Sequence, residues 1–324
     1  MVASIICNYK GDDWEKRVRS VLYDLKNDSV PNYAREIVGD DGVPSVYYEE
    51  ENGIKPGKQF NATIIANYAI NYYKNIDEVD TATKRKFNNC INWLIKNIAY
   101  KNGYALYSFN WQQAWYPSVK GPFTCAMSSG RAIEAFTKAF QLHNDSIYLH
   151  HAKHLIKGFY LPIENGGFTY QERNGWWYEE VADENLKTPR ILDGHIYAIT
   201  GVREYWLQTN DDSAKIIIDK GLAALKHNLP NYDAGNGEIY YDAFRKKADK
   251  KYQKIITSQL KQLHEITSDA VFLSYYEKWN DPQQSFYVMR VIEEGNLSGM
   301  VLIGTLTLII SIIITLLLRL IQKN

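Results

Sequence analysis

The most constraining feature of this sequence is a unit of two helical stretches that recurs four times. An Asn/Asp turn divides each unit, and its Asn is Asn75, Asn144, Asn210 or Asn280, which are 69, 66 and 70 residues apart. Apolar residues at helical spacing predict the helices, and Asp, Ser or Pro is placed to start the second helix of each pair. The expected helices span residues 61–74, 81–99, 126–142, 146–159, 189–207, 213–228, 253–278 and 282–294.

Short β-like segments follow the first three units. Asn-Gly pairs at 102–103, 165–166 and 236–237 are typical of tight turns. The alternating segments after them predict hairpin strands, at 104–109, at 168–172 with 176–180, and at 238–241. The first 60 residues differ, because a Gly-Asp-Asp-Gly turn precedes a strand-like segment, 46–48.

Antiparallel helix pairs that cannot bury their apolar faces alone stack side by side. Four such pairs favour a mainly α fold, an incomplete (α/α) toroid with short β-hairpins at one mouth. A flat helical solenoid is the alternative. The sequence divides into an N-terminal β-containing segment 1–60, a toroid domain 61–294 and a C-terminal stretch 295–324.

Charge and composition exclude one class of function. With 37 basic and 37 acidic side chains, the chain lacks the basic surplus of a dedicated nucleic-acid-binding protein. Its 25 tyrosines and 8 tryptophans suit the faces of sugar rings as well as an ordinary core. Three cysteines without a close pair predict neither a metal site nor a disulfide framework. His150 and His154 are one helical turn apart but lack an acidic partner in register, so no metal is expected.

The C-terminal stretch predicts a membrane-spanning helix. No residue between Gly295 and Leu318 is charged, and the apolar run is long enough to cross a hydrocarbon core of about 30 Å. The first residues lack the basic start and apolar run of a signal peptide. We therefore expect a single-pass membrane protein with a C-terminal anchor. The cations on the two flanks balance, so they do not determine which side the domain faces.

One aromatic and acidic segment is a candidate for a sugar site, the Gly-Trp-Trp-Tyr-Glu-Glu run at 175–180. In a strand, Tyr178 and Glu180 share one face, and Trp177 and Glu179 share the other. Aromatic neighbours partly desolvate a carboxylate and raise its pKa toward that of a useful base or acid. A solvated strand edge or a salt bridge is the alternative interpretation.

Several motifs in a fixed order carry a resemblance to a known family. They are Trp-Tyr-Glu-Glu at 177–180, Ile-Leu-Asp-Gly-His-Ile-Tyr-Ala at 191–198, Leu-Pro-Asn-Tyr-Asp-Ala-Gly-Asn-Gly-Glu-Ile-Tyr at 229–240, then Tyr252 and Ser-Gln-Leu at 258–260. With these motifs, residues 61–262 resemble the C-terminal domain of D-glucuronyl carbon-5 epimerases.

The resemblance implies an isomerase that inverts carbon 5 of a hexuronic acid within a polysaccharide or glycoconjugate, as in glucuronate to iduronate. Such an enzyme removes a proton and returns it on the opposite face, without a dissociable redox cofactor. The resemblance implies Glu180 and Tyr252 as the opposed catalytic pair and Tyr240 as a donor to the developing enediolate. The substrate-binding residues expected with them are Trp177, Tyr178, Glu179, Tyr232, Tyr241 and Arg245.

The sequence also departs from the family pattern. Val181 stands where the family has a functional tyrosine, Asp249 stands where an arginine is expected, and Tyr241 makes the pairing of Tyr240 ambiguous by one position. Two further functions stay open, a polysaccharide lyase that uses the same proton abstraction and a non-catalytic glycan-binding toroid. The expected partners are a uronic-acid-containing glycan and the membrane, and a homodimer is left open.

Overall fold

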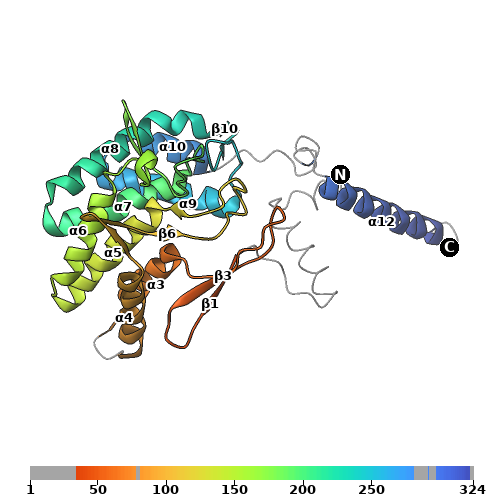
Figure 1. Ribbon diagram of the computed structural model, residues 1–324. Helices are drawn as coiled ribbons and strands as arrows, with labels where there is room; N and C mark the ends of the chain where they lie inside the picture. The colour runs from red at the N-terminus through yellow and green to blue at the C-terminus, as the bar shows by residue number, and fades with distance from the viewer. Residues whose placement is uncertain (1–33, 78–80, 281–290, 292–296, 322–324) are drawn as a thin grey trace. The chain divides into compact units, whose positions relative to one another are not determined.

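The computed structural model describes residues 34–77, 81–280, 291 and 297–321. Residues Asn32–Asn280 form one compact unit, and within its described part the helices make four successive pairs, from orange-brown α3 and α4 to blue α10 (Figure 1). The pairs are α3 (Ala62–Lys74) with α4 (Thr81–Lys96), α5 (Ala126–His143) with α6 (Ile147–Gly158), α7 (Leu192–Thr209) with α8 (Asp212–Asn228), and α9 (Lys250–Thr267) with α10 (Ala270–Asn280).

The first helices of the pairs lie side by side, and the second helices cover them. α3 contacts α5, α5 contacts α7 and α7 contacts α9, while each of these helices also packs against its own partner. Glycines bring α5 and α7 together: a Cβ on Gly130 would lie 2.6 Å from the Cα of Ala198, and one on Gly201 would collide with the Gly130 carbonyl. These helices are the inner and outer layers of an incomplete (α/α) toroid, as the sequence predicts.

The turns inside the pairs correct the sequence prediction in the fourth unit. Asn144 and Asn210 end α5 and α7 in the left-handed conformation, each with a φ of 53°, which asparagine tolerates better than most residues. Ser268 takes this position after α9 with a φ of 57°. The predicted helix 253–278 is therefore two helices, and Asn280 ends the fourth pair instead of dividing it. The predicted helix 282–294 lies, apart from Val291, outside the described residues.

Short hairpins fill the connections between pairs. They are β4 (Ala99–Lys101) with β5 (Tyr104–Leu106), β6 (Ser108–Phe109) with β7 (Phe123–Thr124), β8 (Thr169–Glu172) with β9 (Gly175–Tyr178), and β10 (Asp233–Gly235) with β11 (Glu238–Ile239). The Asn-Gly pairs at 102–103 and 236–237 turn two of them with positive φ, whereas Gly166 ends the 3-10 helix η1 (Ile163–Asn165). Each connection leads from an outer helix to the start of an inner one, so the hairpins gather at one mouth.

The N-terminal part of this unit is a small antiparallel sheet. Its strands are β1 (Ala34–Val38), β2 (Pro44–Tyr48) and β3 (Gly57–Gln59). Tyr68 and Tyr72 of α3 fasten the sheet, because their hydroxyls donate to Glu36 and to the Gly42 carbonyl. The described residues of the predicted segment 1–60 thus contain the expected β structure.

A separate helix, α12, spans Leu297–Ile321. Its Gly299–Leu320 stretch is a candidate membrane span by length and composition, and none of its most apolar window is buried against protein. Thr305, Thr307, Ser311 and Thr315 donate their hydroxyl hydrogens to carbonyls four residues earlier. These bonds satisfy polar groups inside the helix, which an apolar surrounding requires.

Candidate active site

Glu180 lies two residues beyond β9, at the mouth where the hairpins gather. The residue is half-buried, and its Oε2 is shielded from water and has no hydrogen-bond partner among the described residues. The side chain fits against the first turn of α7 because position 194 is a glycine. A Cβ on Gly194 would lie 2.9 Å from the Glu180 Cβ and would collide with Oε2.

Asp193 brings a second carboxylate to the same turn of α7. Its side chain is 3% exposed, and its Oδ1 also lacks a partner among the described residues. Gln259 of α9 donates from Nε2 to the Asp193 carbonyl at 3.1 Å, while its own Oε1 is buried without a donor. Glu180, Asp193 and Gln259 thus each have a buried oxygen that lacks a donor among the described residues, which is uncommon in a folded protein.

Two tyrosines face these carboxylates. Tyr241 follows β11 and Tyr252 lies in the first turn of α9, and their rings are 4.6 Å apart. Trp115 packs edge-on against both, with each ring centroid at 6.1 Å. We call Glu180, Asp193, Tyr241 and Tyr252 the carboxylate–tyrosine cluster. It forms because the starts of α7 and α9 meet the chain that leaves β9 and β11.

Burial and mutual repulsion shift the titration of this cluster. Burial and the neighbouring Asp193 and Glu179 raise the pKa of Glu180 well above its usual range. Burial raises the pKa of Asp193 to about 7, against the backbone N–H groups at the start of α7. Burial, Asp193 and Glu180 also raise the pKa of Tyr252. Near neutral pH the tyrosine is a protonated phenol, and the carboxylates hold protons more tightly than exposed ones do.

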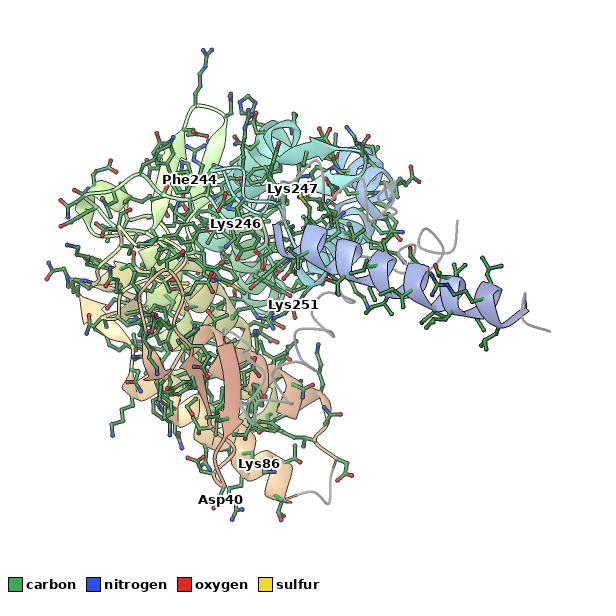
Figure 2. The ribbon with its side chains drawn as sticks, turned by 90° about the vertical axis from the view of Figure 1, so that its right-hand side faces the viewer. Asp40, Lys86, Phe244, Lys246, Lys247 and Lys251 are labelled. Atoms are coloured by element: carbon green, nitrogen blue, oxygen red, sulfur yellow. The ribbon has the colours of Figure 1, made fainter. Side chains whose placement is uncertain are left out.

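Lysines lie over the aromatic rim of the cluster. The Lys246 Nζ is 3.9 Å from the centroid of the Trp115 ring, and the Lys251 Nζ is 5.5 Å from that of Tyr252. Figure 2 shows both on one face with Phe244 and Lys247, apart from Asp40 and Lys86. Burial lowers the pKa of Lys246. These cations could hold a negatively charged group above the carboxylates.

The loop 110–122 between β6 and β7 closes the site from another side. The Tyr116 hydroxyl donates to Asp242 Oδ2 at 2.8 Å, and Asp242 Oδ1 accepts the backbone N–H groups of Phe244 and Lys246. This buried carboxylate ties the loop to the segment that carries Tyr241 and Lys246.

Comparison with known proteins identifies the family of this chain. A model of the D-glucuronyl C5-epimerase C-terminus matches residues 99–281. The chain belongs to this family. A D-glucuronyl C5-epimerase of Caenorhabditis elegans is 30% identical over 163 residues, which cover 46% of this chain and 26% of that protein. An uncharacterized protein of Methanocaldococcus jannaschii is 30% identical over 190 residues, which are 57% of this chain and 59% of that protein.

The chain thus spans less than two thirds of either relative. Among solved structures, a cellobiose 2-epimerase from Bacillus thermoamylovorans has a TM-score of 0.50 at 13% identity, over 67% of this chain and 57% of that chain. This likeness concerns the fold. The C5-epimerase family match contains the whole carboxylate–tyrosine cluster, and it begins after α4.

Three residues that the C5-epimerase resemblance implied as substrate-binding are core residues. Trp177, Tyr178 and Tyr232 are 0%, 0% and 2% exposed. The Trp177 ring stacks on His195 at 4.0 Å and on Tyr232 at 5.7 Å, while the Tyr178 hydroxyl donates to the Ile217 carbonyl. The predicted role is corrected for all three, because a substrate cannot reach side chains covered by packing.

Glu179 is also corrected, from substrate binding to a clamp inside the protein. Its carboxylate is fully buried and accepts the Thr188 hydroxyl at 2.6 Å and the Arg190 backbone N–H at 3.0 Å. Burial raises the pKa of Glu179 to about 7 against these bonds. β9 ends at Tyr178, so Glu179 and Glu180 leave the strand for two different surroundings.

The structure brings Tyr241, and not Tyr240, to Glu180. Tyr240 packs against the core cluster of Trp177, whereas Tyr241 belongs to the larger cluster that Tyr252 covers. The two consecutive side chains thus pack on different sides of this segment. Arg245 is exposed, with its guanidinium 5.9 Å from the Tyr240 ring. Val181 is buried and puts no phenol beside Glu180.

Sequence reasoning did not assign a role to Asp193, Trp115, Tyr116, Asp242 or Lys246. Asp193 stands in the second motif of the resemblance, and its position at a helix start next to Gly194 is a signal that could have pointed to it. The loop that carries Trp115 and Tyr116 has no periodic pattern, so only the folded chain reveals its contact with the site.

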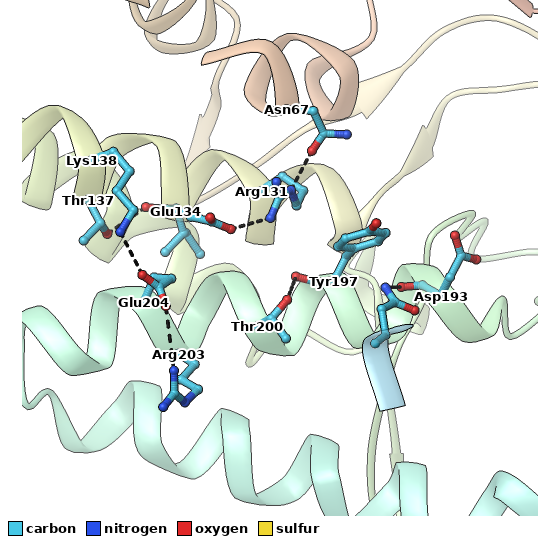
Figure 3. Close-up of polar contacts among 12 residues, drawn as sticks. Asn67, Arg131, Glu134, Thr137, Lys138, Asp193, Tyr197, Thr200, Arg203 and Glu204 are labelled. Atoms are coloured by element: carbon cyan, nitrogen blue, oxygen red, sulfur yellow. Dashed lines mark hydrogen bonds and ion pairs between the residues drawn. The ribbon is translucent and has the colours of Figure 1, made fainter. Parts of the chain in front are cut away.

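A polar network runs along the inner helices from this mouth (Figure 3). Arg131 of α5 donates to Asn67 of α3 and to Glu134, and its guanidinium lies 5.3 Å from the Tyr197 ring of α7. Tyr197 is one turn beyond Asp193. A cavity of about 320 Å³ beside α3 has Asn67 in its wall and none of the predicted site residues.

The histidines of α6 contact one another and Tyr100. The His150 and His154 rings are tilted against each other with their centroids 4.5 Å apart, and the Tyr100 hydroxyl forms a hydrogen bond with His151. Over the residues described here, no group of three or more His, Cys, Asp or Glu side chains is placed to hold a metal ion.

Proposed function

We propose that this chain inverts carbon 5 of a hexuronic acid, as in glucuronate to iduronate, within a polysaccharide or glycoconjugate. The observation that carries the proposal is the meeting of Glu180 and Asp193 with the phenols of Tyr241 and Tyr252 at one mouth of the toroid. Membership of the C5-epimerase family supports this reaction, as does the named activity of the C. elegans relative.

The chemistry follows from the protonation of the groups. The ionised form of Glu180 takes the proton from carbon 5, and the electron pair of the broken C–H bond moves into the neighbouring carboxylate to form an enediolate. Tyr252, whose raised pKa keeps it protonated, returns a proton to the opposite face. Tyr241 donates a hydrogen bond to the enediolate as its charge develops. Proton exchange with water then resets Glu180 and Tyr252.

The substrate carries its own negative charge into an acidic site, so a cation must offset it. Lys246 and Lys251 are the nearest candidates, because both lie over the rings that border the cluster. The weak acidity of the proton at carbon 5 is the main obstacle to this reaction. Neutralising the uronate carboxylate makes that proton more acidic. Trp115 offers its ring as a face for the sugar.

The apolar helix α12 supports a further part of the proposal, that the enzyme is attached to a membrane. Its Gly299–Leu320 stretch suits a bilayer span. The glycan would then be processed close to a bilayer surface.

The test uses the full chain in detergent with a glucuronate-containing polymer in deuterated water. Deuterium at carbon 5 of both epimers, without chain cleavage, is the expected result. An unsaturated product that absorbs in the ultraviolet would identify a lyase instead, and binding without any exchange would identify a glycan-binding protein.

Tyr252→Phe sharpens this test. The variant is expected to exchange the proton of one epimer from the Glu180 side and to form none of the other epimer. Tyr170→Phe, which changes an exposed tyrosine outside the site, is the matched control and should invert as the natural chain does. Normal inversion by Tyr252→Phe would contradict the assignment.

A further inference from the structure

Glu180 packs closely against the first turn of α7, the turn that carries Asp193. Glu180 Oε2 rests against the Cα of Gly194, where any side chain would displace it. Asp193 directly precedes that glycine in the first turn of α7. The Asp193 carboxylate lies close enough for its charge to raise the pKa of Glu180, so the chain after β9 and the start of α7 bring two interacting carboxylates together.

None of the ion pairs among the described residues includes Glu180 or Asp193. Lys251 favours the ionised form of Asp193 from a distance. Two adjacent carboxylates away from water cannot both stay ionised without a large cost, because a low dielectric strengthens their repulsion.

The hydrogen-bond inventory leads to the same conclusion independently. Glu180 Oε2, Asp193 Oδ1 and Gln259 Oε1 are all buried acceptors that have no donor among the described residues. A carboxylate can only accept, whereas a protonated carboxyl supplies one O–H donor. One proton on the pair thus reduces both the electrostatic and the hydrogen-bond deficit.

We propose that Glu180 and Asp193 share a single proton at neutral pH, so that Asp193 is a positioning residue that sets the strength of Glu180 as a base. The idea deepens the proposed epimerase function and rests on it for its catalytic meaning. When the shared proton lies on Asp193, Glu180 is ionised and can take the proton from carbon 5. The pair then carries two protons and no charge, the form that a buried site favours.

The surroundings of the pair add further titrating groups. Those that face it are Glu179 beside it, Cys125 before α5, Tyr116 in the loop 110–122, Tyr197 on α7, Tyr241 after β11, and Lys251 and Tyr252 on α9. The phenols and the thiol stay neutral where carboxyls titrate, because burial raises the pKa of Cys125 to about 12 and that of Tyr241 well above its usual value.

The test compares the full chain with Asp193→Asn and Glu180→Gln, first without substrate. Infrared difference spectra against pH should show a protonated carboxyl band that persists above the usual carboxyl range. In either variant the remaining carboxyl loses its neighbour, and the band should titrate at least about one pH unit lower, since like-charge repulsion is gone. Asp211→Asn, which removes the carboxylate that caps α8, should leave the band unchanged.

The second readout is catalysis. Asp193→Asn should move the acidic limb of the kcat/KM profile about one unit lower in pH, with circular dichroism confirming that the variant is folded. A purely structural role for Asp193 would lower the rate without moving this limb.

Two results would overturn the proposal. One is the absence of the band at neutral pH, which would show that both carboxylates are ionised. The other is calorimetric binding of Ca²⁺ or Mg²⁺ that both variants lose, which would make the pair a cation site. If the band is present but no proton exchanges at carbon 5, the shared proton stands and the epimerase function is rejected. If the proton exchanges but the band is absent, the epimerase function stands and the shared proton is rejected.

Discussion

Two clusters built from the same segments of the chain have opposite characters. The aromatic stack of Trp177, His195 and Tyr232 belongs to the core. Its members are close in sequence to the carboxylate–tyrosine cluster: Trp177 is three residues from Glu180, His195 is two from Asp193, and Tyr232 is nine from Tyr241. In the stack, His195 accepts the Tyr178 N–H and donates to the Gly221 carbonyl. Burial lowers the pKa of His195 to about 3, so the ring is neutral.

The difference is one of hydrogen-bond satisfaction. The Tyr232 hydroxyl also has a partner, the Arg190 carbonyl at 2.6 Å, and only the Trp177 Nε1 in the stack lacks one among the described residues. The carboxylate–tyrosine cluster keeps unpartnered oxygens and shifted pKa values. A core minimises such costs, while a site of proton transfer retains them until a substrate arrives.

The largest expected effect separates the clusters by activity. Glu180→Gln should lower deuterium exchange at carbon 5 by about 10² to 10⁴-fold, the usual contribution of a general base. Its stability should not fall, because the buried charge is removed. Mass spectrometry of the polymer and urea unfolding measure the two quantities. Glu184→Gln on the exposed loop is the control, and a Glu180→Gln variant with normal exchange would remove Glu180 from the mechanism.

The opposite result is expected from the aromatic stack. Trp177→Ala should cost about 3–5 kcal/mol of unfolding free energy, because it leaves a cavity between His195 and Tyr232. Tryptophan fluorescence during urea unfolding measures it. Trp206→Ala, at a half-buried position on α7, should cost less. If Trp177→Ala instead weakened glycan binding in a chain of unchanged stability, the residue would belong to the site after all.

The pH dependence of stability tests the neighbour of Glu180. An unfolded glutamate titrates near 4.3, but Glu179 in the folded chain has its pKa raised to about 7. The folded state then binds more protons, so this contribution is present below pH 4 and is lost as pH rises through 7. It is about 2–4 kcal/mol. Urea unfolding from pH 4 to 8 should show stability falling with pH, and falling less in Glu179→Gln. An unchanged slope in that variant would contradict the buried clamp.

The smallest effect distinguishes two consecutive tyrosines. Tyr241→Phe should reduce exchange by about 10 to 10²-fold, because an enediolate loses one hydrogen-bond donor. Tyr240→Phe is the matched control and should stay within about twofold, since its ring packs against the other core cluster. The kcat of each variant on the same polymer provides the measurement. Equal losses would show that the two side chains act together.

Local structure was predictable from the sequence because local chemistry specifies it. Asparagine in the left-handed position and Asp after it mark the turns inside the pairs, and apolar periodicity marks the helices. The predicted turn of the fourth pair was wrong, because Ser268 takes the left-handed position there and serine is uncommon at such a position. The predicted helix 189–207 also began three residues before the observed start of α7 at Leu192. Arg190 has a φ of 50°, which is not helical.

Within the site, the sequence pointed to Glu180, Tyr241 and Tyr252, whose assigned roles stay predictions. It could not tell which of two consecutive residues faces the carboxylates. The surroundings of Trp177, Tyr178, Glu179 and Tyr232 depend on where β9 ends and on what covers it. The predicted strand 176–180 extended two residues beyond the observed end of β9 at Tyr178.

The sequence by itself determined the repeated helix pairs, the hairpin turns, the apolar span and the family, because each depends on residues close in the chain or on a motif in order. Only the tertiary structure decided that Asp193 comes within electrostatic reach of Glu180 and that Tyr116 reaches Asp242. Those contacts join segments 13 and 126 residues apart. Burial and charge repulsion act through space, so the chemistry of the site exists only after the starts of the inner helices have been brought together.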